Sequence, residues 1–201
     1  MPITTLFIDK TDTLIKKNRT EHIEKSARLL GVPTQKFYEA YHWTYLDYSS
    51  GKIRNDNEYY KLILKKLGMP PNGKIMKKLH EIFMNAFELY PQTHTVLKAL
   101  KKKYKLIMLS NHVSAWIDAY LKRFRLKEYF DDVIISDAVG VRKPDPEIFK
   151  IAMKRAGCKP EECAFIDDKE KNVEAARKLG MCGIVVDPKL GIPRDIDEQL
   201  R

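Results

Sequence analysis

Apolar and polar positions divide the chain into two kinds of segment. Short apolar runs rich in β-branched residues occur near the start and again after residue 90, and helical periodicity separates the later ones. The five runs predicted to be strands are residues 3–8, 106–109, 133–135, 163–166 and 183–186. The helices predicted around them are residues 93–103, 114–123, 145–156 and 169–179. This alternation predicts an α/β fold, a doubly wound parallel five-stranded sheet with helices on both faces.

The middle of the chain shows helical periodicity alone. Four helices are predicted there, over residues 20–30, 34–48, 55–68 and 72–89, with Thr34 as the N-cap of the second. No strand-like alternation interrupts them. Residues 16–89 are therefore expected to form an α-helical cap domain, inserted into an α/β core made of residues 1–15 and 90–201.

Composition narrows the class of protein. Of the 201 residues 44% are apolar, enough for a substantial core, and the three cysteines lack zinc-like spacing. No apolar run approaches the roughly 18 residues of a membrane span, and the first residues do not resemble a signal peptide. We expect no membrane association and a cytoplasmic location.

The formal net charge of +10 has two interpretations. It could indicate binding to nucleic acid or another polyanion, or a solvated surface rich in lysine and glutamate. The lysines are spread along the chain, which favours the second interpretation and argues against nucleic acid as the main partner. A positive field could still attract small phosphorylated molecules.

Polar residues follow several of the predicted strands. Asp9 follows the first strand, Ser110 and Asn111 the second, and Asp167 and Asp168 the fourth. Lys143 precedes the helix between the third and fourth strands. Each could be a turn or capping residue by itself. In an open parallel sheet, however, the carboxyl ends of the strands share one edge, where ligands bind. Several carboxylates with a lysine and a hydroxyl there suit a hard cation and a phosphate, and oxygen ligands favour Mg²⁺.

Four segments in order carry a family resemblance: FIDKTDTL at residues 7–14, IMLSN at 107–111, KPDPEIF at 143–149 and FIDDKEKN at 165–172. With the helical insertion after the first segment, the chain resembles the haloacid dehalogenase (HAD)-like hydrolase superfamily of phosphatases and related hydrolases, with a fold described as Rossmann-like.

The resemblance implies a role for each residue. Asp9 would attack phosphorus and form an aspartyl-phosphate, and Ser110 and Asn111 would bind the phosphate oxygens. Lys143 would neutralise the phosphate and hold Asp9 in place. Mg²⁺ would be held by Asp9, the backbone carbonyl of Thr11, Asp168 and, directly or through water, Asp167. Thr13 would stabilise the first loop and Asn172 would order the fourth motif.

The first motif departs from the family pattern at two positions. An aspartate usually stands two residues after the nucleophile, where it protonates the leaving group and then activates water. Here Thr11 stands there, and a hydroxyl is a poor general base near neutral pH, so hydrolysis of the aspartyl-phosphate could be slowed by ~10²–10⁴-fold. The next position is usually glycine, and here it is Asp12, which tolerates a left-handed backbone and could act as a substitute acid or base.

These observations leave three functions open. The leading hypothesis is an Mg²⁺-dependent phosphatase of a small phosphorylated metabolite, and the second is a protein of low or no activity that binds a phosphate ligand or a partner. The third is a hydrolase similar to 2-haloacid dehalogenases. His112 follows the second motif and could either contact substrate or pack. The substrate and the oligomeric state are not specified by any motif.

Overall fold

The computed structural model describes residues 2–200, which divide into two compact units. Residues up to Lys16 and residues from Leu89 onward form the core unit, and Lys17–Glu88 form the helical unit. Within residues 2–200, no helix combines the length and apolar character needed to cross a membrane.

The core unit is built on a five-stranded sheet in the order β5-β4-β1-β6-β7, in which neighbouring strands are parallel. The strands are β1 (Thr5–Ile8), β4 (Lys105–Ser110), β5 (Asp132–Ile135), β6 (Cys163–Asp167) and β7 (Cys182–Val185). β1 lies at the centre, where Ile8 is in register with Met108 of β4 and Ile166 of β6. All four residues of β1 are buried, as expected for a strand covered on both faces. The predicted five-stranded parallel sheet is confirmed.

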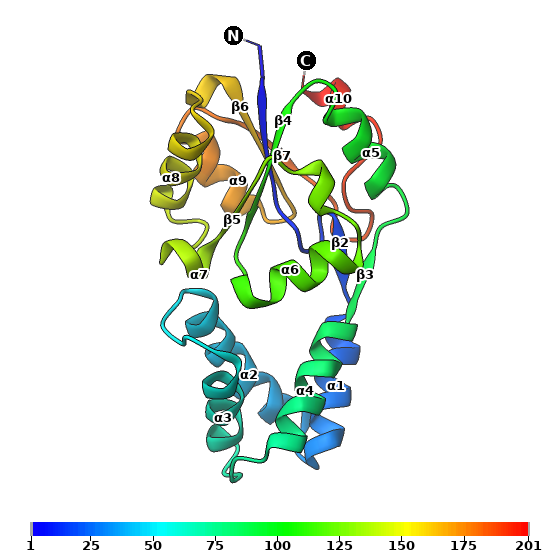
Figure 1. Cartoon of the computed structure of the whole chain (residues 1–201), viewed down its shortest axis with the longest axis vertical. Helices are drawn as coiled ribbons and strands as arrows, with labels where there is room; N and C mark the ends of the chain where they lie inside the picture. Colours follow the sequence, from blue (N-terminus) through cyan, green and yellow to red (C-terminus); the bar gives the residue numbers. More distant parts are fainter. Residues whose placement is uncertain (1, 201) are drawn as a thin grey trace. The chain divides into compact units, whose positions relative to one another are not determined.

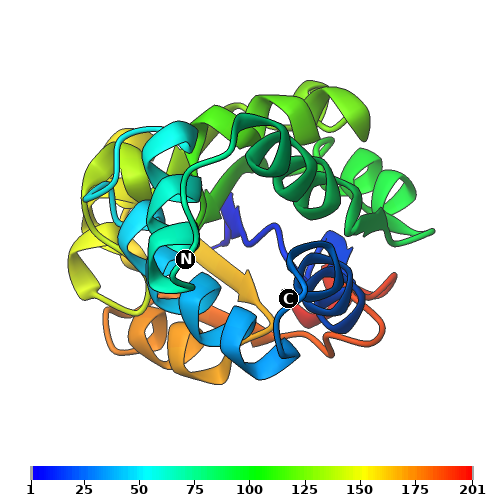
Figure 2. The same ribbon diagram turned by 90° about the horizontal axis from the view of Figure 1, so that it is seen from below.

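Helices cover both faces of this sheet. The core helices are α5 (Thr93–Leu100), α6 (Ser114–Arg123), α7 (Ser136–Val139), α8 (Pro146–Ala156), α9 (Glu170–Arg177) and α10 (Ile196–Gln199), with 3₁₀ turns at η1 (Lys127–Tyr129) and η2 (Pro160–Glu162). α5 and α6 lie on one face, and α8 and α9 on the other (Figures 1 and 2). Phe149 of α8 packs edge-on against Phe165 of β6, with ring centroids 5.1 Å apart. The chain changes face between β5 and β6, which makes the carboxyl end of central β1 a topological switch point.

The helical unit contains four helices with recognisable ends. They are α1 (Arg19–Leu30), α2 (Thr34–Ser49), α3 (Asp56–Lys66) and α4 (Gly73–Asn85). Asn55 and Asn72 accept backbone hydrogen bonds as N-caps, and Gly31 ends α1 in the left-handed conformation. The expected cap at Thr34 is wrong, because Thr34 is the first residue of α2 and Pro33 holds the cap position.

Aromatic rings fill the centre of the helical unit. His22 of α1 lies edge-on to Tyr41 of α2 and Phe83 of α4, with centroid distances of 4.9 and 5.1 Å. Lys17 closes one side, donating to the Tyr41 hydroxyl at 2.7 Å with its ammonium 4.4 Å from the centre of the Phe83 ring. These contacts join α1, α2 and α4 to the chain segment that enters the unit.

A second, two-stranded sheet lies where the chain passes between the units. It pairs β2 (Ile15–Lys17) with β3 (Phe87–Leu89). The sequence pattern predicted a helix up to residue 89, which is wrong, because α4 ends at Asn85. A strand of three residues is too short to show an alternating pattern in the sequence. The helical pattern of the residues before β3 was therefore continued into β3.

Candidate functional site

The ends of β1, β4 and β6 bring the predicted site residues together. Asp9 continues directly from β1, and its amide donates to Ile166 O of β6 at 2.9 Å. Ser110 is the last residue of β4, and Asp167 is the last residue of β6. Lys143 arrives from the segment between α7 and α8 and contacts Asp9 and Asp167. Residues far apart in sequence therefore share one edge of the sheet, as the strand-end pattern predicted.

Lys143 is the centre of this arrangement. Its ammonium lies 2.6 Å from Asp9 Oδ1, 2.7 Å from Asp167 Oδ2 and 2.6 Å from the carbonyl oxygen of Leu109. These three acceptors match the three N–H donors of a lysine. All three charged groups are buried: Lys143 is 4% exposed, Asp9 5% and Asp167 0%. The network places two carboxylates around one cation in a region of low dielectric.

Burial and neighbouring charges shift the pKa values of this network in opposite directions. Burial by itself lowers the pKa of Lys143, but the charges of Asp167 and Asp9 outweigh it, and the pKa is raised above its usual value. Burial raises the pKa of Asp9 despite the opposing charge of Lys143. The pKa of Asp167 is lowered, because Lys143 and further donors outweigh its burial. Lys143 is therefore charged at neutral pH and Asp167 is a fixed anion.

Asp167 uses both of its oxygens within the protein. Its Oδ1 accepts from the amide of Lys169 at 2.8 Å and from Asn172 Nδ2 at 3.1 Å. Its Oδ2 accepts from Lys143 at 2.7 Å and from Asn172 Nδ2 at 3.0 Å. By contrast, Asp9 Oδ2 accepts no hydrogen bond within residues 2–200. Asp167 is thus suited to hold Lys143, whereas Asp9 keeps one oxygen for other chemistry.

Asp168 has a different environment from its neighbour Asp167. Its Oδ1 is buried and accepts no hydrogen bond in the described residues, although Lys169 Nζ lies 3.5 Å away. Burial raises the pKa of Asp168 to about 6, with Lys169 opposing and Asp9, Asp167 and Asp12 adding to the rise. A buried carboxylate beside other carboxylates is costly without a cation.

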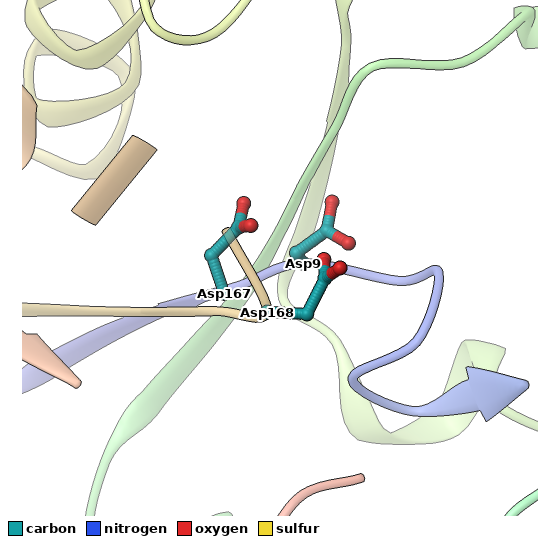
Figure 3. Close-up of side chains that lie close together, drawn as sticks. All are labelled: Asp9, Asp167 and Asp168. Atoms are coloured by element: carbon teal, nitrogen blue, oxygen red, sulfur yellow. The ribbon is translucent and has the colours of Figure 1, made fainter. Parts of the chain in front are cut away.

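The three carboxylates converge on one small space. Ligand oxygens of Asp9, Asp167 and Asp168 all lie within 4.8 Å of one another. Figure 3 shows the side chains of Asp9 and Asp168 projecting beyond the strand ends with Asp167 beside them. An all-oxygen donor set of this kind fits a hard divalent cation. Among the described residues, Asp168 Oδ1 is the atom best placed for one, since it is buried without a hydrogen bond and Asp167 is already occupied.

Asn111 holds the backbone of Lys143 in place. Its Nδ2 donates to Lys143 O at 2.8 Å, and its Oδ1 accepts from Lys143 N at 2.9 Å. The alternative that Ser110 or Asn111 caps the next helix does not apply, because α6 begins at Ser114 with Val113 in the cap position. Asn111 therefore links the second motif to the third.

The loop after β1 forms a tight turn around Lys10. The amides of Leu14 and Ile15 both donate to Lys10 O at 3.0 Å. Asp12 adopts φ 65°, the left-handed conformation that its replacement of glycine led us to expect, and its side chain is 3% exposed. Thr13 is buried and its carbonyl accepts from Ile192 N at 2.7 Å, while Thr11 is half-buried. The loop is therefore a closed, hydrogen-bonded turn that accommodates Asp12 in the left-handed conformation.

Lys10 is a charged residue to which the motifs give no role. Its side chain is fully buried, and its ammonium lies 4.1 Å from the centre of the Tyr120 ring. Burial lowers the pKa of Lys10 to about 7, against the charges of Asp9 and Asp12. His112 packs edge-on to the same ring at 5.5 Å and is 1% exposed, which favours its packing interpretation over substrate contact. The sequence signal for this burial was the position of Lys10 directly after the buried Asp9. Successive side chains of an extended segment point in opposite directions, so neighbours can both be buried when the segment is covered on two sides.

Fold and site together define a doubly wound parallel α/β core with an acidic, lysine-bridged centre at its switch point. The family model for haloacid dehalogenase-like hydrolases matches residues 3–180. The chain belongs to this family, as its motifs predicted.

Curated relatives include phosphatases of small metabolites. Glyceraldehyde 3-phosphate phosphatase of Pyrococcus furiosus is 27% identical over 192 residues, 89% of this chain and 78% of that protein. Phosphoserine phosphatase of Thermus thermophilus is 35% identical over 103 residues, 50% of this chain and 41% of that protein. Glyceraldehyde 3-phosphate phosphatases of Methanopyrus kandleri and Methanothermobacter thermautotrophicus are 29% and 34% identical, and the chain spans only 57% and 50% of their lengths.

Solved structures match over almost the whole chain. A HAD-like family hydrolase from Porphyromonas gingivalis has a TM-score of 0.84 at 26% identity, covering 100% of this chain and 99% of that one. A HAD family enzyme from Bacteroides thetaiotaomicron, solved in complex with magnesium and inorganic phosphate, has a TM-score of 0.81 at 26% identity, covering 92% of this chain and 95% of that one.

Proposed function

We propose that this protein is an Mg²⁺-dependent phosphatase that hydrolyses a small phosphorylated metabolite through an aspartyl-phosphate on Asp9. The observation that carries the proposal is the buried Asp9–Lys143–Asp167 network with Asp168 beside it. The phosphatase relatives and the magnesium–phosphate complex of the Bacteroides enzyme support it.

Asp9 acts as the nucleophile through Oδ2. Lys143 binds Oδ1 and so fixes the carboxylate while Oδ2 remains available. Attack forms a bond between Asp9 Oδ2 and phosphorus, and the ester oxygen departs with its bonding electrons and takes up a proton. Water then attacks phosphorus, the bond to Asp9 breaks, and inorganic phosphate leaves. The nucleophilic carboxylate is regenerated.

Mg²⁺ would be held by Asp9 and Asp168 together with the carbonyl oxygen of Thr11, and Asp167 would contribute through water because both of its oxygens accept hydrogen bonds. When bound, the ion lowers the repulsion between Asp9 and a dianionic phosphate. The buried Oδ1 of Asp168, which accepts no hydrogen bond within residues 2–200, supports this assignment.

The remaining residues position the phosphate and the network. Ser110 and Asn111 bind phosphate oxygens at the end of β4, and Lys143 offers positive charge to the same group. Asp167 holds the Lys143 ammonium, Asn172 holds Asp167, and Thr13 supports the first loop.

Thr11 affects the two steps of the proposed mechanism, formation and hydrolysis of the aspartyl-phosphate, differently. The network needed to form the aspartyl-phosphate is present, but no carboxylate stands at position 11 to activate water. We infer a slow second step for this reason. The same residue favours the second candidate, a protein that binds a phosphate ligand or a partner with little turnover.

The test is release of inorganic phosphate from an aryl phosphate and from a panel that includes phosphoserine and glyceraldehyde 3-phosphate. Wild type, Asp9→Asn and the control Asp131→Asn, which removes an exposed carboxylate, are assayed with MgCl₂ and with EDTA. We expect turnover that needs Mg²⁺, is abolished in Asp9→Asn and is retained in Asp131→Asn.

Three results would contradict the proposal. Turnover in Asp9→Asn would exclude Asp9 as the nucleophile. Ligand binding without turnover by wild type would support the binding-protein candidate, and metal-independent halide release from a 2-haloacid would support a dehalogenase.

A further inference from the structure

One stretch of the core unit is strongly positive. Residues 98–127 contain nine lysine and arginine residues and one acidic residue, so they carry +8 of the formal net charge of +10. The nine basic side chains are all exposed. The remainder of the chain carries +2 overall, although residues 61–78 of the helical unit form a second basic stretch with six lysines and no acidic residue.

The fold arranges this stretch around two neighbouring hollows in the surface of the core unit. One hollow, of about 510 Å³, is lined by Lys122, Arg125 and Lys127 near the end of α6. The other, of about 490 Å³, is lined by Lys98, Lys101 and Lys102 at the end of α5. Glu128 of η1 lines both, so the hollows adjoin. We name these six basic residues the basic patch.

The basic patch lies at the opposite edge of the sheet from the candidate active site. α5 ends just before β4 begins, whereas Ser110 is at the other end of β4. η1 is tied to the beginning of β4, because Asp131 N donates to Leu106 O at 2.8 Å and Leu106 N donates to Asp131 Oδ2 at 2.9 Å. A ligand on the patch therefore does not occupy the edge that holds Asp9.

Few acidic groups neutralise the patch. Lys101 lies 3.8 Å from Asp131, and Asp118 and Glu128 also line the hollows. Within residues 2–200, the other five basic residues of the patch form no ion pair. Such a concentration of cations around concave surface favours a ligand with several regularly spaced anions.

We propose that the basic patch binds the phosphate backbone of a single-stranded nucleic acid. The half-buried Tyr129 lines one hollow and offers an aromatic surface beside the lysines. An anionic membrane is the competing partner. Stable membrane binding usually adds apolar insertion to charge, and none of the large apolar residues exposed in the described chain, Tyr38, Trp43, Val185 and Leu190, lies in the patch.

The experiment is fluorescence anisotropy of a fluorescein-labelled single-stranded oligonucleotide titrated with the full chain at several salt concentrations. We expect binding whose log–log salt dependence has a slope of about −3.5 to −4.2, corresponding to five or six phosphate contacts. The triple variant Lys122→Gln, Arg125→Gln, Lys127→Gln should reduce the slope by about 2 and weaken binding at low salt by at least about tenfold.

A matched control separates the patch from general positive charge. The variant Lys61→Gln, Lys65→Gln, Lys66→Gln removes the same charge from exposed positions on α3 and should bind like wild type. Far-UV circular dichroism and melting temperature establish that both triple variants are folded. The proposal is refuted by absence of oligonucleotide binding, by equal loss in both variants, or by patch-dependent binding to phosphatidylserine vesicles without patch-dependent binding to the oligonucleotide.

Discussion

Replacing Lys143 by methionine tests the central network most directly. Methionine keeps most of the length of the side chain but removes the ammonium that contacts Asp9 and Asp167 at 2.6 and 2.7 Å. The substitution leaves two buried carboxylates facing each other without their common cation. Removing one partner of a buried ion pair costs about 3–5 kcal/mol.

The structure sets the pH at which this loss is measured. Asp167 keeps its bonds from Asn172 and the Lys169 amide, so its charge stays partly compensated. Asp9 loses the hydrogen bond from Lys143 and must bind a proton or stay repelled by Asp167. The pKa of Lys143 is raised in the folded state, so its contribution is fully present below the unfolded value of about 10.5 and is lost as pH rises through the folded pKa. At pH 7 we expect the full loss of about 3–5 kcal/mol.

Urea unfolding at pH 7 with EDTA measures the change in the free energy of unfolding. A Trp43→Phe background leaves Trp116 as the single tryptophan, and this residue is buried in the core unit, so its emission reports core unfolding. The control Lys169→Met removes a lysine whose side chain is 46% exposed and 3.5 Å from Asp168, and it should cost less than about 1 kcal/mol. A Lys143→Met variant within about 1 kcal/mol of its parent would refute the network as the source of this stability.

Two further substitutions test Thr11 and His22. Thr11→Asp should raise turnover by about 10²-fold or more in a steady-state phosphate-release assay, whereas Thr11→Asn, of the same shape without an acid, should not; equal rates in both would mean that water activation is not limiting. Burial, followed by the charge of Lys17, lowers the pKa of His22 to about 2. As pH falls from about 6.5 towards 2, the unfolded chain binds a proton that the folded chain does not, so the free energy of unfolding decreases. Between pH 7 and pH 5 this loss amounts to about 2 kcal/mol in urea unfolding, and His22→Phe should remove that part of the slope; parallel slopes would contradict a buried neutral His22.

Strand and site positions were predictable from sequence for one physical reason. The runs before Asp9, Ser110 and Asp167 are short and apolar, and parallel strands place their carboxyl ends together whatever the intervening chain does. The contact between Lys143 and Asp9 was expected from the family resemblance, because Lys143 lies in the loop between α7 and α8 and not at a strand end. Wherever a strand ended in a polar residue, the local sequence was sufficient to predict where that residue lies in the fold.

Other features depend on tertiary contacts that no local pattern encodes. The β2–β3 ribbon consists of two three-residue strands about seventy residues apart, and neither shows alternation by itself. The burial of Lys10 under Tyr120 depends on the placement of α6. The basic patch is visible as charge between residues 98 and 127, but its division into two adjoining hollows depends on how α5, α6 and η1 pack.

The pair Asp167 and Asp168 shows how environment separates the roles of neighbouring identical residues. Successive side chains at a strand end point to opposite sides, so only one of the two can face Lys143. Asp167 takes that position, and with Asn172 and the Lys169 amide its pKa is lowered. Asp168 faces the other carboxylates and has its pKa raised to about 6. The first is therefore a permanent counter-ion that keeps Lys143 charged, and the second is an anion whose stability at neutral pH depends on a cation. Divergent pKa values in adjacent carboxylates favour divergent functions, and this divergence supports the proposal that Asp168 binds a cation while Asp167 holds Lys143.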